Sequence, residues 1–258
     1  MKNYFRYAFS RYPYWLSVFS VLIGIIGILP MCSYLAFVLV VLCFIFSFLI
    51  PFISALSKRK YKLKTIGKTK LSISFGNILD KDCFLITTNR NFDVKPDGVY
   101  ISPDSLLGKF VEKYYPNNVS ELERLIKEQL PQDSNNQIKP IAYGKTIQIN
   151  QENKIIYFMA FTDRKKNNQP EDFYIKSVQG FLKEINNANH GRTIYIPLLG
   201  DNNNLSRTGF SESKQALKSL ITMINQFEIA DQRSELKIEI VVLPEKRAEL
   251  IDTIAFYS

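Results

Sequence analysis

Histidine and cysteine are scarce in this chain of 258 residues. It has one histidine, His190, and three cysteines, Cys32, Cys43 and Cys83. A single histidine excludes a metal site built from several imidazoles, and the cysteines lack the close spacing of a zinc site. Two of the cysteines lie in apolar runs, so we expect no disulfide framework and a reducing compartment.

Acidic residues are absent from the first 70 positions, which carry ten lysines and arginines. The other 23 basic residues are balanced by 24 acidic ones, so the net charge of +9 belongs to the N-terminal segment. A near-neutral remainder lacks the basic surface of a nucleic-acid-binding domain, and we expect no nucleic-acid partner.

Charge of either sign is absent from residues 12–57. This stretch holds two apolar blocks, at about 14–29 and 33–53, which Pro30 separates. A helix that spans a bilayer needs about 20 residues, with a range of roughly 17–25. One helix over the whole stretch would be far too long, so the sequence predicts a two-helix transmembrane hairpin over residues 1–57.

Basic residues flank both ends of the predicted hairpin, and the turn between its helices has none. Lys2, Arg6 and Arg11 precede it, and seven more basic residues lie in the segment 58–70. By the positive-inside rule both ends face the cytoplasm. We expect 58–70 to be a basic juxtamembrane linker that lies against anionic lipid. A signal peptide, the competing interpretation, would show a small-residue cleavage site and no second span.

Four small residues share one face of the first predicted span: Ser17, Ser20, Gly24 and Gly27. Small residues let helices approach closely in lipid. We therefore expect the chain to form a homo-oligomer in the membrane.

From residue 71 the pattern becomes that of a globular domain, which we expect to extend to residue 258. Strands are predicted at Lys70–Phe75, Cys83–Thr87, Ile138–Ile149, Lys154–Phe161, Thr193–Leu199 and Leu236–Leu243, and helices at Asp104–Tyr115, Asn118–Leu130, Pro170–Ile185 and Ser211–Phe227. Ser120 is placed to cap the second of these helices. Several strands are apolar on both faces, which is typical of a sheet with helices on both sides. The predicted fold class is α/β, with a mixed sheet flanked by helices.

Polar loops follow three of the predicted strands, at 75–82, 87–110 and 196–210. Open α/β sheets bind ligands beyond the carboxyl ends of their strands. The second and third loops lead into helices, whose free N–H groups attract anions. They could hold a diphosphate, with Arg207 adding charge. Ordinary strand-to-helix turns are the alternative, and neither loop has a Walker A or G-x-G-x-x-G pattern.

The loop sequences carry a family resemblance. The stretches "FGNIL" and "DCFLITTNRNFD" resemble the opening of a macro domain, and "ISPDSLLGKF" and "IPLLGDNNNLSRTGF" resemble two loops of the bacterial macro-like family found behind transmembrane hairpins. The resemblance covers about Leu71–Leu243 and implies binding of ADP-ribose or a derivative. It implies that Asn77 and Ile78 face the adenine and that Asn89 faces the distal ribose.

The same resemblance implies that the segments 102–109 and 200–207 wrap the diphosphate. The full set of expected ligand-binding residues is Asn77, Ile78, Asn89, Ser102, Ser105, Leu106, Gly108, Lys109, Gly200, Asp201, Asn202, Asn203, Leu205, Ser206 and Arg207. No metal, cofactor or catalytic residue is expected.

A macro domain behind a membrane hairpin resembles the membrane effector of type II Thoeris anti-phage defence. That resemblance implies a cytosolic sensor in the bacterial inner membrane. Its signal would be an ADP-ribose derivative, a histidine conjugate made by a partner TIR-domain enzyme. Binding would drive oligomerisation, membrane disruption, and cell death or growth arrest.

Two positions depart from the family pattern. Asn77 stands where the turn usually has an acid, and Asp201 stands in a loop that would face phosphate. We therefore expect the Asn77 amide oxygen to accept from the adenine amine. Asp201 would read a positive or hydrogen-bonding part of the signal.

Two other functions stay open. A membrane-tethered ADP-ribosyl hydrolase would use Asn89 and Asp93, but "NRNFDVKPDG" replaces the expected glycine-rich catalytic loop and no histidine base lies nearby. A tethered scaffold that binds protein and no nucleotide is the third possibility.

Overall fold

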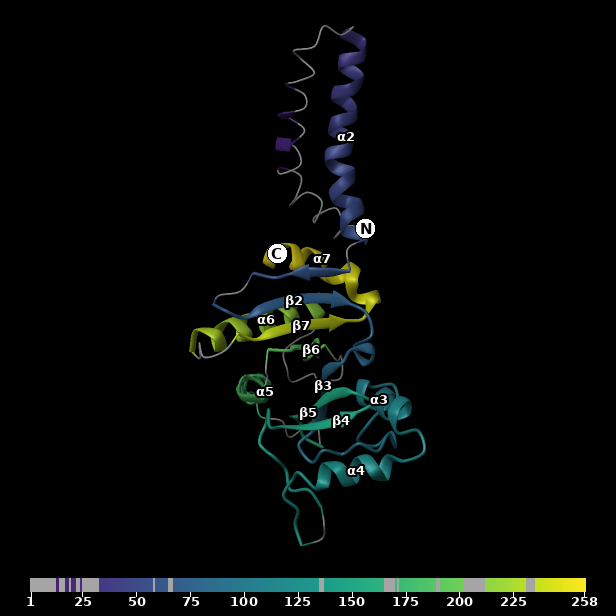
Figure 1. The fold of residues 1–258 in the computed structure, drawn as a ribbon, viewed down its shortest axis with the longest axis vertical. Helices are drawn as coiled ribbons and strands as arrows, with labels where there is room; N and C mark the ends of the chain where they lie inside the picture. Colours follow the sequence, from purple (N-terminus) through teal and green to yellow (C-terminus); the bar gives the residue numbers. More distant parts are fainter. Residues whose placement is uncertain are drawn as a thin grey trace.

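The computed structural model describes residues 13, 17–18, 20–21, 24, 33–57, 59–64, 67–134, 137–164, 170, 172–188, 191–201, 212–230 and 235–258. Within these residues the chain forms one seven-stranded sheet with helices on both faces and a long helix that projects from one end (Figure 1).

The sheet is mixed, as predicted. Its strands are β1 (Lys60–Lys62), β2 (Lys70–Phe75), β3 (Cys83–Asn89), β4 (Thr146–Gln151), β5 (Lys154–Thr162), β6 (Thr193–Pro197) and β7 (Lys237–Val242). They lie in the order β1-β2-β7-β6-β3-β5-β4. The five central strands are parallel, and the edge strands β1 and β4 pair antiparallel. The central strands are apolar on both faces because helices cover both.

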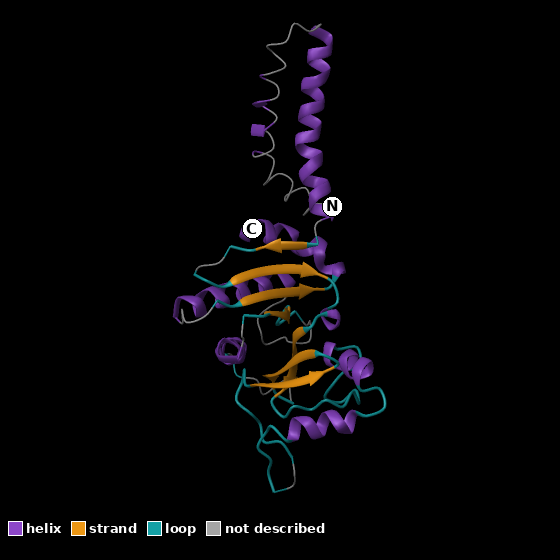
Figure 2. Ribbon diagram, in the orientation of Figure 1, coloured by secondary structure: helices purple, strands orange, loops and turns teal. Residues whose placement is uncertain are grey.

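The helices divide between the two faces of the sheet (Figure 2). They are α3 (Leu106–Tyr114), α4 (Val119–Lys127), α5 (Phe173–Ala188), α6 (Ser213–Ala230) and α7 (Arg247–Tyr257). Side chains of α5, α6 and α7 share one buried cluster with β2, β6 and β7. Side chains of α3 and α4 share a second cluster with β3, β4 and β5. The α/β prediction with helices on both faces is confirmed.

Helix α2 (Ser33–Ser57) covers the second predicted span and projects from the domain (Figure 1). In the described part of the chain no helix meets the combined length and apolarity that a membrane crossing requires. Most of the first predicted span, 14–29, lies outside the described residues. The hairpin therefore stays a prediction.

The segment predicted as a linker, 58–70, contributes a strand to the sheet. Lys60–Lys62 pairs antiparallel with β2, and the Tyr61 side chain is 1% exposed in the larger cluster. The alternation of exposed lysines with Tyr61 is the period of an edge strand. The domain therefore begins only three residues after α2 ends.

The strand predicted at Ile138–Ile149 is wrong in its first half. A turn at Gly144 precedes β4, and this glycine has φ 77°. A Cβ at this position would lie 2.5 Å from the Ser177 carbonyl oxygen and 2.7 Å from the Gly180 Cα on α5. The close packing of this turn on a helix, rather than strand pairing, sets its backbone.

Two further details of the helices differ from the prediction. Asn118, not Ser120, is the N-cap of α4, and the Ser120 hydroxyl donates to the Asn118 Oδ1 at 3.1 Å. Helix α7 was not predicted at all. It buries Leu250, Ile251 and Ile254 against the sheet's larger cluster.

Candidate functional site

The carboxyl ends of five parallel strands lie along one edge of the sheet. Because β2, β7, β6, β3 and β5 run in the same direction, the loops that follow them leave from this edge. The neighbours β6 and β3 connect to helices on opposite faces, α6 and α3. Ligands of open α/β sheets bind where the chain diverges in this way. All the described residues of the predicted site belong to these loops.

The loop after β2 is fixed by its own asparagine. The Asn77 Oδ1 accepts the Leu79 N–H at 3.0 Å and so caps a short 3-10 helix, η1 (Ile78–Asp80). Ile78 is 5% exposed and packs in the cluster under α3. The amide oxygen of the exposed Asn77 retains one lone pair, so it can still accept the predicted adenine contact.

Helix η1 is fastened to α3, which joins the first loop to the second. The Tyr114 hydroxyl donates to the Leu79 carbonyl at 2.9 Å, and the Lys113 ammonium lies 3.0 Å from the Asp80 carboxylate. The structure therefore brings the loop of Asn77 and Ile78 to α3, whose N-terminus was predicted to hold phosphate.

Asn89 ends β3 and is almost fully buried, at 4% exposed. Its Oδ1 accepts the N–H groups of Asn91 and Asp93 at 3.1 and 3.2 Å, and its Nδ2 donates to the Asp93 carboxylate at 2.8 Å. Phe92 completes this tight loop in the left-handed region, with φ 52°. The amide of Asn89 therefore holds the loop in place, and its predicted contact with ribose stays a prediction.

Arg164, directly after β5, grips the same carboxylate. Its Nε and Nη2 each donate to an Asp93 oxygen at 2.6 Å, and its guanidinium lies 5.2 Å from the Tyr100 ring centroid. The hydrogen bond to Asp93 raises the pKa of Arg164 above its ordinary value. Sequence reasoning missed Arg164, because its partner lies 71 residues earlier in the chain.

The start of α3 is capped by Ser105. Its hydroxyl accepts the Gly108 N–H at 3.0 Å and donates to the Ser102 carbonyl at 2.6 Å. A Cβ on Gly108 would lie 2.4 Å from the Pro103 carbonyl oxygen and 2.5 Å from that of Ser102. Gly108 is therefore needed for packing of the loop on the helix, and not for the approach of a ligand to its backbone. Lys109 is exposed, and its N–H bonds the Ser105 carbonyl.

Two N–H groups at the start of α3 remain for a ligand. Those of Leu106 and Leu107 have no protein acceptor within the described residues. The Leu107 side chain is 4% exposed and Leu106 packs against the same cluster, so both side chains face the protein. The anion-binding capacity of this loop is thus a matter of backbone groups.

Gly200 turns the chain after β6 with φ 82° and leads to Asp201. The Asp201 carboxylate accepts the hydroxyl hydrogen bond of Ser213 and lies 3.6 Å from the Lys246 ammonium. Its charge therefore faces the protein's own cation, against the expectation that it reads part of the signal. The remaining predicted residues of this loop lie outside the described residues: Asn202, Asn203, Leu205, Ser206 and Arg207.

The first N–H of α6 is also taken by the protein. Ser213 N–H donates to the Glu249 carboxylate of α7 at 3.1 Å. An acid at a helix N-terminus satisfies a free donor and complements the dipole. The expectation that α6 offers its first amide to a diphosphate is therefore wrong.

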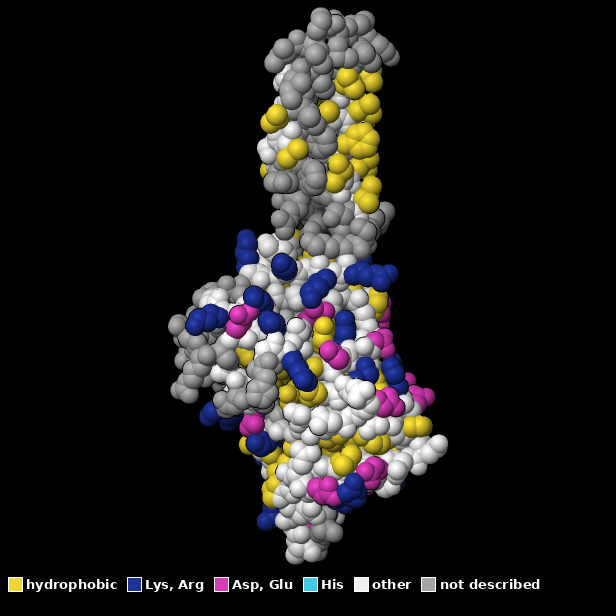
Figure 3. Space-filling model, viewed as in Figure 1, with side chains coloured by type: hydrophobic (Ala, Val, Ile, Leu, Met, Phe, Trp, Pro, Cys, Tyr) yellow, Lys and Arg dark blue, Asp and Glu magenta, His cyan; other side chains and the backbone are white. Residues whose placement is uncertain are grey.

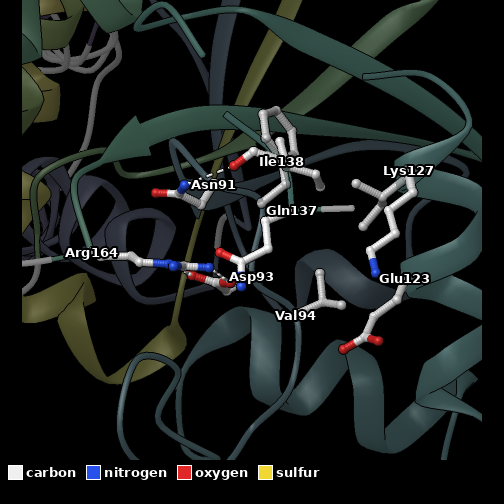
Figure 4. Close-up of a pocket in the computed structure, with 10 residues that line it drawn as sticks. Asn91, Asp93, Val94, Glu123, Lys127, Gln137, Ile138 and Arg164 are labelled. Carbon is white, nitrogen blue, oxygen red and sulfur yellow. Dashed lines mark hydrogen bonds and ion pairs between the residues drawn. The ribbon is translucent and has the colours of Figure 1, made fainter. Parts of the chain in front are cut away.

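A cavity of about 180 Å³ lies beside the Asn89 loop (Figure 4). Its walls are the loop 91–94, one side of α4, the segment 137–138 and Arg164. Asp93 and Arg164 stand opposite Glu123 and Lys127 of α4, none of which except Asp93 was predicted as a functional residue. Ligand sites of drug size occupy roughly 300–1,000 Å³, so a whole nucleotide does not fit here.

Cys83 is unsuited to nucleophilic chemistry. Burial, and then the charge of Asp82, raise the pKa of its thiol to about 11, against a smaller lowering by Arg192. The thiolate, which is the reactive form, is scarce at neutral pH. Among the described residues no cluster of three metal-ligating side chains exists.

Comparison with solved structures defines the class of protein. A variant of the Oceanobacillus iheyensis macrodomain solved with ADPR aligns at a TM-score of 0.52 and 16% identity, over 76% of this chain and 96% of that one. The form with MES bound aligns at 0.52 and 16% identity, over 76% and 95%. This likeness establishes a macrodomain fold and confirms that prediction.

The family follows from the sequence match. The model of the family "Thoeris protein ThsA, Macro domain" matches residues 71–243, and the chain belongs to this family. Thoeris protein ThsA of Bacillus amyloliquefaciens (strain Y2) is 25% identical over 165 residues, which cover 59% of this chain and 55% of that protein. The chain thus spans about half the length of this relative.

Proposed function

We propose that this chain is a membrane-anchored sensor of Thoeris anti-phage defence whose macro domain binds an ADP-ribose-derived nucleotide. The observation that supports the proposal most is the family match over residues 71–243. A solved macrodomain of the same fold carries ADPR in its name, which makes this nucleotide the first ligand to test.

The carboxyl edge of the sheet suits such a ligand. Asn77 can accept from an adenine amine, and the N–H groups of Leu106 and Leu107 point out of a helix start, where negative charge is stabilised. The contact between η1 and α3 places these two elements side by side. An adenine on η1 and a diphosphate on α3 are therefore compatible with one molecule.

Binding without catalysis is the function that the Asn89 loop favours. A hydrolase would need the Asp93 carboxylate to accept a proton from water. That carboxylate already accepts three hydrogen bonds, two from Arg164 and one from Asn89. The same bonds make the loop rigid, which favours a preformed binding surface.

The N-terminal segment suggests what binding controls. We propose that residues 1–57 form a hairpin in the bacterial inner membrane, with both termini in the cytoplasm. Basic side chains gather where α2 meets the domain, and the described surface of α2 is apolar (Figure 3). Arg59, Lys60 and Lys62 are exposed at this junction and suit anionic lipid headgroups.

In this proposal a partner TIR-domain enzyme supplies the signal, a histidine conjugate of ADP-ribose, and binding favours a homo-oligomer that disrupts the membrane. A shift from 1:99 to 99:1 between resting and assembled states needs about 5.5 kcal/mol of differential binding. Because β1 follows α2 after only a few residues, a change at the domain is transmitted to the helix without a flexible linker.

Thermal unfolding of the full chain in detergent, with ADP-ribose, its histidine conjugate or AMP added, tests the sensing step. The first two should raise the midpoint in a concentration-dependent way, and chromatography of the ligand should show no product. No stabilisation by any ADP-ribose derivative would contradict the sensor, and turnover would favour the hydrolase. Dye release from liposomes that carry the chain tests the membrane step with the same ligands.

A further inference from the structure

The Asp201 clamp is a cluster at the start of α6, made by Asp201, Ser213, Lys246 and Glu249. Lys246 comes from the connection between β7 and α7, beside the end of β6. Its ammonium donates to the Ser213 Oγ at 3.0 Å and lies 3.6 Å from Asp201 and 3.8 Å from Glu249. One cation is thus shared by two carboxylates.

The clamp bears on a difficulty in the proposed site. Asp201 directly follows the Gly200 turn, in the loop expected to face a diphosphate. A free carboxylate there would repel the ligand, because like charges a few ångströms apart interact strongly at low dielectric. Lys246 and the Ser213 hydroxyl both engage Asp201, whose side chain is only 18% exposed.

We infer that Lys246 is a positioning residue for anion binding at the Gly200 loop: it neutralises Asp201 and holds its carboxylate against α6. This inference rests on the proposed function, since it concerns the same site. It makes Asp201 a structural acid tied to the protein and not a reader of the signal. It also assigns a role to the β7–α7 connection.

The charges predict an order of affinities. Lys246→Met leaves two carboxylates without their shared cation and should weaken ADP-ribose binding roughly tenfold at low salt. Asp201→Asn should bind as tightly as the parent chain or more tightly. The double variant restores the parent balance of one carboxylate near the loop, so its affinity should return to within about threefold of the parent. Lys246→Arg should retain binding.

Lys214→Met is the matched control. Lys214 follows Ser213 on α6, and its ammonium pairs with Asp252 of α7 at 3.1 Å. This change also removes one positive charge and one ion pair between α6 and α7, but it leaves Asp201 with its partner. Its affinity should change less than that of Lys246→Met, and Asp201→Asn should not offset what change there is.

The test is calorimetry of the full chain in detergent with ADP-ribose, and with inorganic pyrophosphate as a probe of the diphosphate alone. Thermal unfolding of each ligand-free variant separates lost folding from lost binding. Unchanged affinity in Lys246→Met overturns the inference while leaving the sensor intact. Failure of Asp201→Asn to restore binding also overturns it, because Lys246 would then contact the ligand itself. A parent chain that binds neither probe overturns both this inference and the proposed function.

Discussion

Replacing Lys60 by methionine should destabilise the domain more than replacing its buried partner Glu239 by glutamine. The Glu239 side chain is 3% exposed in the middle of β7, whereas that of Lys60 on β1 is 55% exposed. Ser74 donates to the same carboxylate at 2.6 Å, and Lys81 lies 3.8 Å away. The cost of a change therefore depends on which charge it leaves behind.

The magnitudes follow from solvation. Removing one partner of a buried ion pair costs about 3–5 kcal/mol when the other charge stays buried. Lys81 compensates in part, so we expect about 2–3 kcal/mol for Lys60→Met. Glutamine keeps an oxygen for Ser74 and releases Lys60 to water, so Glu239→Gln should cost only about 1–2 kcal/mol. The double variant should resemble Glu239→Gln and be more stable than Lys60→Met alone.

Thermal unfolding of the full chain in detergent, followed by circular dichroism, measures these differences. At about 2–4 °C per kcal/mol for a domain of this size, Lys60→Met should lower the midpoint by roughly 5–10 °C. Lys62→Met, two residues along the same exposed edge, is the control and should change stability by at most about 0.5 kcal/mol. Additive losses in the double variant would refute the reasoning, as would a neutral Lys60→Met.

Four further predictions follow from described contacts. Acidification should unfold the parent chain sooner than Glu239→Gln. Burial works to raise the Glu239 pKa, but Lys60, Ser74 and Lys81 hold it below its ordinary 4.5, so its contribution is full above that pH and is lost as pH falls through the lower folded value. Ser105→Ala should cost about 1 kcal/mol and weaken nucleotide binding, because it loosens the α3 start, whereas the matched Ser120→Ala on α4 should do neither. Asp93→Asn should weaken the Arg164 contact and speed amide exchange of the Asn89 loop without creating or abolishing turnover. Gly144→Ala should lower stability by at least 2 kcal/mol or so in a denaturant titration, given its φ of 77° and its contact with α5.

Local sequence pattern predicted the central strands well. The apolar run at Cys83–Thr87 reads as a buried strand, and β3 is buried on both faces. Pattern failed at Ile138–Gly144, because the backbone there follows the packing of a glycine turn on α5 and not its own alternation. It also missed β1, whose three residues were read only for their charge.

The site was predictable in its loops and not in its contacts. The positions of Asn77 and Ser105 near helix starts follow from local preferences, and both cap as such residues do. The partners of Asp201 and Asp93 do not, because Lys246 and Arg164 reach them from distant parts of the chain. Side chains that were assigned to a ligand by resemblance are thus held first by the protein itself.

One titration would decide whether the carboxyl edge of this sheet is a nucleotide sensor. Isothermal calorimetry of the full chain with ADP-ribose and its histidine conjugate should show one ligand per chain, with the conjugate bound more tightly and AMP bound weakly. Heats indistinguishable from dilution for both ADP-ribose compounds, in protein that unfolds cooperatively, would contradict the proposal.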